Sequence, residues 1–293
     1  MRPKIQIYDL GLFLGKYLLT MIVYPNAKIN LGLNVINKRT DGYHNLNTIF
    51  YPVPLCDAVE FVLAIDNKTS FSSSGIPVGG LAEDNLIMKA YTLLSGYHKL
   101  PALKIHLHKV IPMGAGLGGG SADAAFFLAA LNSFFNLNHS QEALADMARI
   151  LGADCAFFIY NAPCLATERG DRFKFLEERL KNKFLILIKP TVHVSTADAY
   201  SGVVPSSPAY SNEFVYLNEP IDNWEGKMFN DFEKSVFIKY PEIKQIKERL
   251  YALGAQYASM SGSGSTVFGI FDKEINVDFD IFPANYFIWK GTL

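Results

Sequence analysis

The sequence predicts an α+β protein with two domains. Strand-like runs and amphipathic helical runs are mixed along the 293 residues, without the regular strand–helix alternation of a parallel α/β fold. That length suffices for two modest domains. Hydrophobic residues make up 49% of the chain and charged residues 19%, so enough apolar side chains are present to bury a core. A glycine-rich segment at residues 112–123 lies between a strand-like run and a helical run, and it is the main candidate for a functional site.

Charge and cysteine content exclude several classes of protein. The net charge is −1, so no global basic field attracts nucleic acid or anionic lipid, and we expect neither as a partner. No apolar run reaches membrane-spanning length, and we expect no membrane association. Three cysteines without Cys-x-x-Cys spacing argue against a disulfide framework and a metal site. We therefore expect a cytoplasmic protein. We also expect a monomer or a weak homodimer.

The N-terminal segment has an uncertain status. Residues 1–20 contain a semi-apolar stretch that glycines interrupt, and no small-residue cleavage site follows, so a signal peptide is not expected. Met21 opens a run that has the features of a natural start. We therefore treat residues 1–20 as a leader.

The first clear element is a half-buried strand. Apolar and polar residues alternate strictly from Ala27 to Val35, which places Lys28 and Asn30 side by side on the polar face. An Asp-Gly pair at 41–42 then predicts a tight turn. Further strand-like runs follow at residues 48–53 and 58–63.

Helices with short connections are expected in the middle of the chain. Serine and glycine at 72–75 and 79–80 predict a loop, and Asp84 predicts the N-cap of a helix that runs to about His98. Alternation at 103–107 predicts a strand. The other expected helices span 121–135, with Ser121 as N-cap, and run from Ser140 to Gly152.

The C-terminal part contains both kinds of element. Arg169-Gly170-Asp171 predicts a hairpin turn, and the apolar run at 183–189 predicts a buried strand. Proline, serine and asparagine are frequent at 201–223, which predicts an irregular segment. A helix from Pro241 to Gly254 has apolar residues spaced by three and four. A small-residue loop at 259–265 precedes a predicted strand at 266–271.

The glycine-rich segment has the properties of a phosphate-binding loop. Five of its residues between positions 114 and 120 are glycines, and bare backbone can curl so that successive amides point inward around an anion. The helix that follows adds free amides and the positive end of its dipole. The residues expected to contact a nucleotide are Pro112, Met113, Gly114, Ala115, Gly116, Leu117, Gly118, Gly119, Gly120, Ser121 and Ala122.

Two common nucleotide motifs compete for this loop. A P-loop requires lysine after the last glycine, but Ser121 follows Gly120. The dinucleotide fingerprint G-x-G-x-x-G is formally met from Gly114 to Gly119. That fingerprint also needs an acidic residue about twenty positions later, and the region around Leu137 has none. A nicotinamide oxidoreductase is therefore disfavoured.

Three ordered sequence blocks resemble the superfamily of galactokinase, homoserine kinase, mevalonate kinase and phosphomevalonate kinase. The run from Pro112 to Asp123 resembles the ATP-binding signature of that superfamily. The blocks at 25–31 and 259–269 follow its order. The sequences A-K-I-N-L-G-L, D-G-Y-H and G-A-D-C-A-F-F narrow the resemblance to one branch. Members of that branch phosphorylate the 2-hydroxyl of 4-diphosphocytidyl-2-C-methyl-D-erythritol in the non-mevalonate isoprenoid pathway. The leader and Cys155-Ala156 depart from the pattern.

The resemblance implies a fold and its ligands. It implies a two-domain GHMP-kinase-like α+β fold, with a ribosomal-protein-S5-like N-terminal domain and a ferredoxin-like C-terminal domain. Residues 21–180 would bind ATP and carry catalysis, and residues 181–293 would close the substrate cleft. The cofactors would be ATP and Mg²⁺, the ion being held mainly by phosphates and water. The small-molecule substrate would carry a cytidine diphosphate group.

The resemblance also implies roles for residues outside the glycine loop. It makes Asp154 the base, with Lys28 as the cation that orients Asp154 and the substrate oxygen. Without it, a helix cap and an exposed strand lysine would be the ordinary explanations of these two residues. The expected substrate contacts are Asn30 through hydrogen bonds, Tyr43 and Tyr200 through stacking on cytosine, His44 at the edge of the ring, and Gly262 and Gly264 near the diphosphate.

Two alternatives stay open beside this interpretation. Another kinase of the same superfamily would act on homoserine or mevalonate, which carry no base for Tyr43 and His44 to contact. A ligand-binding relative without catalysis would not need Lys28 and Asp154 together with the glycine loop.

Overall fold

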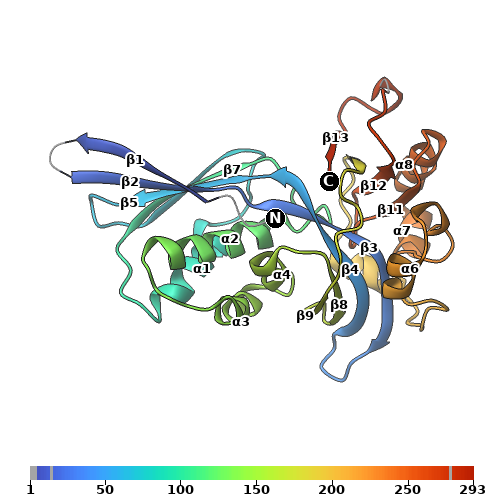
Figure 1. The fold of residues 1–293 in the computed structure, drawn as a ribbon, viewed down its shortest axis with the longest axis horizontal. Helices are drawn as coiled ribbons and strands as arrows, with labels where there is room; N and C mark the ends of the chain where they lie inside the picture. Colours follow the sequence, from blue (N-terminus) through green and yellow to red (C-terminus); the bar gives the residue numbers. More distant parts are fainter. Residues whose placement is uncertain (1–4, 14–15, 277–278) are drawn as a thin grey trace. The chain divides into compact units, whose positions relative to one another are not determined.

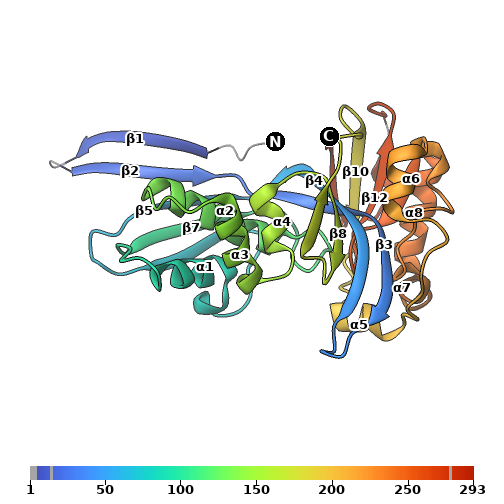
Figure 2. The same cartoon turned by 60° about the horizontal axis from the view of Figure 1, so that its bottom comes forward.

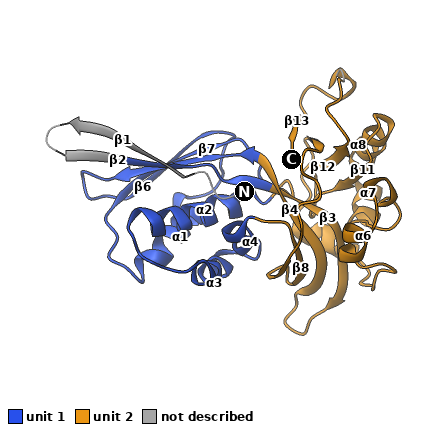
Figure 3. Cartoon of the chain, viewed as in Figure 1, with its two compact units in different colours: residues 1–27, 55–113, 118–161 blue, residues 28–54, 114–117, 162–293 orange. Residues whose placement is uncertain are grey.

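The computed structural model describes residues 5–13, 16–276 and 279–293. The chain forms two compact units, each assembled from separate stretches of sequence (Figure 3). Unit 1 comprises residues 1–27, 55–113 and 118–161, and unit 2 comprises residues 28–54, 114–117 and 162–293. The glycine loop therefore leaves unit 1 after Met113 and returns to it at Gly118.

Unit 1 has helices on one face of a five-stranded sheet (Figures 1 and 2). The strand order is β1-β2-β5-β7-β6, and all neighbours are antiparallel except β6 and β7. The strands are β1 (Ile5–Phe13), β2 (Lys16–Val23), β5 (Ala58–Leu63), β6 (Ser70–Gly75) and β7 (Leu103–Lys109). The helices are α1 (Leu86–Ser95), α2 (Gly119–Phe134), α3 (Gln141–Leu151) and α4 (Cys155–Tyr160), with a 3₁₀ turn, η1 (Ala82–Asp84).

Alternation in β7 explains how that sheet is covered. Leu103, Ile105 and Leu107 are buried, whereas Lys104 and His108 on the other face are not. A sheet with one apolar and one polar face buries the apolar face under helices. Helix α2 is the central cover, since ten of its residues are buried.

Residues 5–13 and 16–20, which lie in the segment treated as a leader, form β1 and the first part of β2. Two other expectations for unit 1 were wrong. The serine-rich run at 72–75, expected to be a loop, belongs to strand β6, which is parallel to β7. Asn85 caps α1 in place of Asp84, because its Oδ1 accepts a hydrogen bond from the amide of Ile87 at 2.9 Å. The helix from Ser140 to Gly152 was predicted correctly, with the Ser140 side chain as its N-cap.

Unit 2 contains two four-stranded sheets. The strands of the first sheet, in the order β3-β4-β8-β9, are β3 (Asn26–Lys38), β4 (His44–Cys56), β8 (Cys164–Glu168) and β9 (Arg172–Phe175). The first residues of β3 and the last of β4 belong to unit 1. The turn between β8 and β9 is the one expected at Arg169–Asp171. The strands of the second sheet are β10 (Phe184–Lys189), β11 (Tyr257–Met260), β12 (Val267–Phe271) and β13 (Phe287–Thr292).

The second sheet confirms the ferredoxin-like part of the predicted fold. Its order β11-β12-β10-β13 is antiparallel throughout and corresponds to the 2-3-1-4 order of ferredoxin-like domains. The core between this sheet and helix α8 includes Ile186, Leu250 and Val267. The helices of unit 2 are α5 (Thr196–Ser201), α6 (Asn212–Asn218), α7 (Glu233–Lys239) and α8 (Pro241–Ala252), with 3₁₀ turns η2 (Ile221–Asn223) and η3 (Phe279–Ile281).

The segment at 201–223 is more regular than expected. It contains α6 and η2, because Ser211 caps α6 and the side chains of Val215 and Tyr216 are buried. None of the helices in the described part of the chain has both the length and the apolar character that crossing a membrane requires.

Candidate active site

The glycine loop has a backbone that only glycine adopts without strain. Gly114, Gly116 and Gly118 have φ angles of +59°, +75° and +72°, so left-handed residues alternate with others along the loop. Such alternation turns successive amides toward the same side, which is the geometry of an anion nest. At Gly116 the backbone also passes so close to the late loop that a Cβ atom would lie 1.9 Å from the carbonyl oxygen of Ser261.

The loop ends at the N-terminus of α2 in unit 1. Gly118, and not the expected Ser121, is the N-cap, and the amide of Ala122 donates the first helical hydrogen bond to the Gly118 oxygen at 2.9 Å. The amides of Gly119, Gly120 and Ser121 precede that bond, at the positive end of the helix dipole. Gly120 is exposed, which leaves this helix end accessible to an anion.

Lys28 and Asn30 lie together on the polar side of β3, as the alternation predicted. Both are buried, and the Nζ atom of Lys28 donates a hydrogen bond to Asn30 Oδ1 at 2.6 Å. The backbone amide of Lys28 donates to the oxygen of Leu117 in the glycine loop at 2.9 Å. The Nδ2 atom of Asn30 donates to Thr48 Oγ1 at 3.0 Å, so β4 fixes the orientation of the amide. All ten residues from Asn26 to Val35 are buried, so the prediction of a half-buried strand was wrong, and the ordinary alternative of an exposed strand lysine is excluded.

The late loop joins this cluster through Ser261. Its hydroxyl donates a hydrogen bond to the oxygen of Gly116 at 2.8 Å and accepts one from the amide of Asn30 at 3.3 Å. Gly262 has a φ angle of +56°, and a Cβ atom there would lie 3.3 Å from the Cα atom of Gly116. Gly264 has a φ angle of +90° and packs against the side chain of Met260. Parts of all three sequence blocks thus meet within unit 2.

Asp154 begins helix α4 in unit 1. It occupies the N-cap position, is partly buried, and its side chain makes no capping hydrogen bond, so capping does not explain it. The next residue, Cys155, is fully buried in the core. Burial raises the pKa of its thiol to about 12, an effect that a hydrogen bond to Ser121 partly offsets. Through this Cys155–Ser121 contact, the start of α4 lies beside the start of α2.

The aromatic residues expected at the substrate base occupy two places in unit 2. The rings of His44 and Tyr200 stack on each other, with centroids 4.7 Å apart and planes 22° apart. Tyr43 is 59% exposed, and the guanidinium of Arg169 lies over its ring at 5.4 Å from the centroid. The structure therefore brings His44 and Tyr200 together and pairs Tyr43 with a cation.

Sequence reasoning missed residues that hold these elements in place. Ser261 was part of the noted late loop, but nothing distinguished it from the neighbouring serines. The Nδ2 atom of Asn230 donates to the oxygens of Met260 and Gly262, both at 2.8 Å, and thereby fixes that loop. Asn230 lies in an unremarkable stretch of sequence, and no local signal would have found it.

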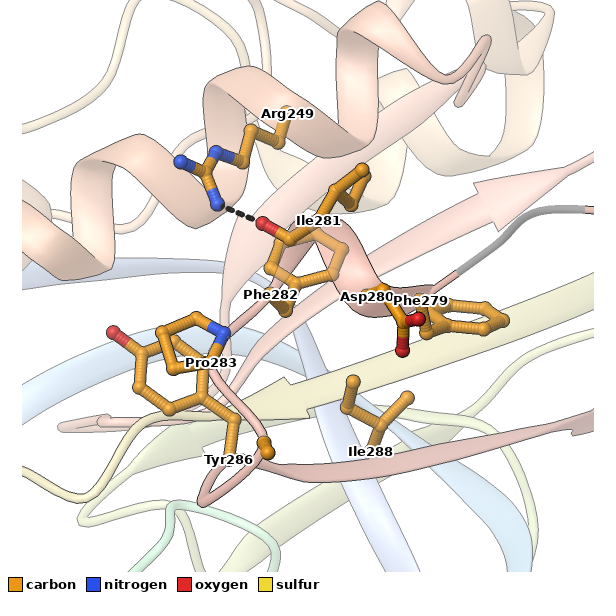
Figure 4. A pocket seen from close by; sticks show the side chains of 9 residues that line it. Arg249, Phe279, Asp280, Ile281, Phe282, Pro283, Tyr286 and Ile288 are labelled. Carbon is orange, nitrogen blue, oxygen red and sulfur yellow. Dashed lines mark hydrogen bonds between the residues drawn. The ribbon is translucent and has the colours of Figure 1, made fainter.

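A separate cavity opens in unit 2 beside helix α8 (Figure 4). Its volume is about 710 Å³, and Arg249, Phe279, Tyr286 and Ile288 are among its lining residues. The guanidinium of Arg249 donates a hydrogen bond to the oxygen of Ile281 at the rim. None of the predicted site residues lines this cavity. Within residues 5–13, 16–276 and 279–293 no group of three or more His, Cys, Asp and Glu side chains is arranged to hold a metal ion.

Comparison with protein-family models matches both parts of the chain. Residues 85–162 match the model described as "GHMP kinases N terminal domain", and residues 215–281 match "GHMP kinases C terminal". The first match contains the glycine loop and Asp154, and the second contains the late loop.

Curated relatives and solved structures extend this similarity to most of the chain. A Parabacteroides distasonis protein named 4-diphosphocytidyl-2-C-methyl-D-erythritol kinase is 50% identical over 274 residues, which cover 93% of this chain and 100% of the relative. A Bacteroides fragilis protein of the same name is 54% identical over 256 residues, covering 87% and 93%. A crystal structure of 4-(cytidine 5'-diphospho)-2C-methyl-D-erythritol kinase matches with a TM-score of 0.71 and 33% identity, covering 86% of this chain and 91% of that one.

Proposed function

The chain belongs to the GHMP kinases, and within them to the family of 4-diphosphocytidyl-2-C-methyl-D-erythritol kinases; from this premise we propose its reaction and the residues that carry it. The protein is an ATP-dependent kinase. It transfers the terminal phosphoryl group of ATP to the 2-hydroxyl of 4-diphosphocytidyl-2-C-methyl-D-erythritol, in the non-mevalonate isoprenoid pathway.

One observation from the structure carries the assignment of the residues. The hydrogen bonds that join Lys28, Asn30, Ser261 and Gly116 bring the early strand, the glycine loop and the late loop together. These are the three blocks by which the sequence resembles the family. A chain that had lost its function would have no reason to keep a buried lysine at this junction, because burying a charge is costly.

The glycine loop fits the phosphates of ATP. Its alternating left-handed glycines and the open N-terminus of α2 offer backbone amides and a positive dipole, and these favour a multiply charged anion. Residues Pro112 to Ala122 form this binding segment. Bound ATP supplies the phosphoryl group, and Mg²⁺ would be held mainly by its phosphates and by water.

Lys28 and Asp154 divide the remaining chemistry. Asp154 is the base: it accepts the proton of the 2-hydroxyl when that oxygen attacks the terminal phosphoryl group. Lys28 orients the attacking oxygen and neutralises developing negative charge. The hydrogen bond between Cys155 and Ser121 supports this assignment, because it places the start of α4, where Asp154 lies, beside the end of α2 that we assign to phosphate binding.

The cytidine end of the substrate would be held in unit 2. We assign Tyr43 to stacking on cytosine, His44 to the edge of the ring and Tyr200 to a second stacking contact; the stacking of Tyr200 on His44 supports a common location for these two rings. Asn30 would bind the alcohol end of the substrate. The backbone at Gly262 and Gly264 would approach the diphosphate.

Membership of the family also suggests roles for the two parts of the chain. We assign ATP binding and catalysis to residues 21–180 and closure of the substrate cleft to residues 181–293. The enzyme would work in the cytoplasm, since its cysteine content fits a reducing compartment. We further propose that it is a monomer or a weak homodimer.

A coupled assay of ADP formation with three alcohols tests the function. We expect ADP to form with 4-diphosphocytidyl-2-C-methyl-D-erythritol, at a kcat/KM at least about a hundredfold above that with mevalonate or homoserine, because only the first carries a base. A preference for one of the other two alcohols would assign the chain to another branch. No ADP with any of the three would favour a ligand-binding relative.

A further inference from the structure

Three charged side chains are buried together beside the glycine loop in unit 1. The Nζ atom of Lys109, the last residue of β7, lies 2.5 Å from Asp57 Oδ2 and 2.6 Å from Asp123 Oδ2. None of the three side chains is more than 4% exposed. Asp123 lies in the second turn of α2, where the hydrogen bond from Lys109 Nζ fixes its side chain.

The cluster holds the entrance of the glycine loop. The second carboxylate oxygen of Asp57, Oδ1, accepts hydrogen bonds from the amides of Val110 at 2.6 Å and Ile111 at 2.8 Å. These two residues connect β7 to Pro112, where the loop begins. Asp57 therefore fixes the path of the backbone into the loop.

The same cluster lies directly against the exit of the loop. A Cβ atom on Gly119 would be 3.0 Å from Lys109 Nζ and 2.9 Å from the side chain of Ile111. Because glycine has no Cβ atom, the first residue of α2 can approach Lys109 and Ile111 this closely. One turn later, Asp123 ties the helix to the same lysine.

The cluster carries no net charge only if one of its two carboxyl groups is protonated. One cation faces two carboxylates, and Asp123 Oδ1 is buried without a hydrogen-bond partner. Burial raises the pKa of Asp123 to about 8, Lys109 lowers it and Asp57 raises it. Lys109 from β7 and Asp57 from the β4–β5 connection are the charged groups that act on Asp123 in the described part of the chain. At neutral pH a proton on Asp123 leaves the cluster without net charge.

We propose that Lys109, Asp57 and Asp123 are positioning residues for ATP binding, which hold both ends of the glycine loop at the spacing its phosphate-binding amides require. The inference rests on the proposed function, because it takes ATP as the ligand of the loop. The three residues would not contact the nucleotide, but the reaction would depend on them through the position of the loop.

The charge count gives this role a pH dependence. Deprotonation of Asp123 above about pH 8 leaves a net negative charge buried under the start of α2, where phosphate binds. An ATP-bound protein therefore holds the Asp123 proton more tightly than the free protein does. It follows that ATP affinity is constant below the pKa that Asp123 has in the free protein, and that it falls above that pKa.

Direct titration of ATP into the full-length protein at about pH 7 and about pH 9.5 tests this dependence. We expect the Kd of the wild type to rise about tenfold between the two values, which corresponds to one pKa unit of coupling. Asp123→Asn keeps the Lys109–Asp57 pair balanced and should remove that rise. Asp66→Asn, at an exposed carboxylate paired with Lys104 at 2.8 Å, should behave as the wild type. An equal rise in wild type and Asp123→Asn overturns the proposal.

A second pair of variants tests the positioning role itself. Lys104 and Lys109 lie on the same strand, and each pairs with an aspartate. We expect Lys109→Met to raise the Kd of ATP at least about tenfold and to leave the KM of the alcohol substrate within about twofold, whereas Lys104→Met changes neither. Equal ATP affinity in both variants contradicts the proposal.

The outcomes separate this inference from the proposed function. If Lys109→Met does not fold, the pH dependence of the Kd of ATP in the wild type and in Asp123→Asn still tests the proposal. ATP binding with the predicted pH pattern, but no transfer to the cytidine-bearing alcohol, removes the proposed substrate and leaves the inference standing. A wild type that binds no ATP overturns both.

Discussion

The environment of Lys28 fits the orienting role that we propose for it. A strand lysine normally extends to solvent, but here the side chain is 3% exposed and its ammonium lies 4.8 Å from the ring centroid of Phe50. Together with its hydrogen bond to Asn30, this contact compensates part of the cost of removing a charge from water. The side chain is thereby held in one position, which orienting a reacting oxygen requires.

Tyr43 gives the sharpest prediction at this scale. We expect Tyr43→Ala to raise the KM for the cytidine-bearing substrate about tenfold, since stacking on a base contributes about 1–3 kcal/mol, and to leave the KM for ATP unchanged. Tyr210→Ala is the matched control, because Tyr210 is also an exposed tyrosine of unit 2 with a cation over its ring, Lys227 at 5.9 Å. Equal KM values in the two variants, measured by steady-state kinetics, would remove Tyr43 from the base site.

The glycine loop is the element to which we assign nucleotide binding. Gly116→Ala forces a Cβ atom against the Ser261 oxygen, so the loop must move, and we expect the Kd of ATP to rise at least about tenfold. Gly80→Ala controls for backbone strain, because Gly80 has a φ angle of +90° and a Cβ atom there would meet no other atom within 4 Å. Both substitutions cost about 1 kcal/mol of left-handed strain. Calorimetric titration should find weakened ATP binding only in the first, and weakening in both would refute the steric explanation.

Elements with strong local signals were predicted correctly, and elements that depend on packing were not. Ser140 and Pro241 begin their helices as expected, because capping and proline geometry act within a few residues. Helix α4 was missed, since a six-residue apolar run carries no helical period and becomes helical through its packing on α2 and α3. The N-cap of α2 was misassigned to Ser121, because a left-handed glycine can end the loop without any side-chain signal.

At the scale of the whole molecule, the fold class was predictable and the partners in the site were not. Mixed strand and helix patterns indicated two α+β domains, and the strand order of the second sheet confirmed the ferredoxin-like part. The bond between Ser261 and Gly116 joins residues 145 positions apart, and no local pattern can pair them. The composition of the two units could not be predicted for the same reason, because each unit combines three stretches that lie far apart in the sequence.

The assignment of Asp154 as the base is tested most directly by single-turnover phosphoryl transfer from ATP to 4-diphosphocytidyl-2-C-methyl-D-erythritol. We expect Asp154→Asn to slow transfer about 10²- to 10⁴-fold, with the Kd of ATP and the unfolding temperature unchanged, because an amide cannot accept the proton of the alcohol. Asp146→Asn is the control, since Asp146 lies exposed on α3 of the same unit and pairs with Arg149. Transfer at the wild-type rate in Asp154→Asn would contradict the proposed mechanism.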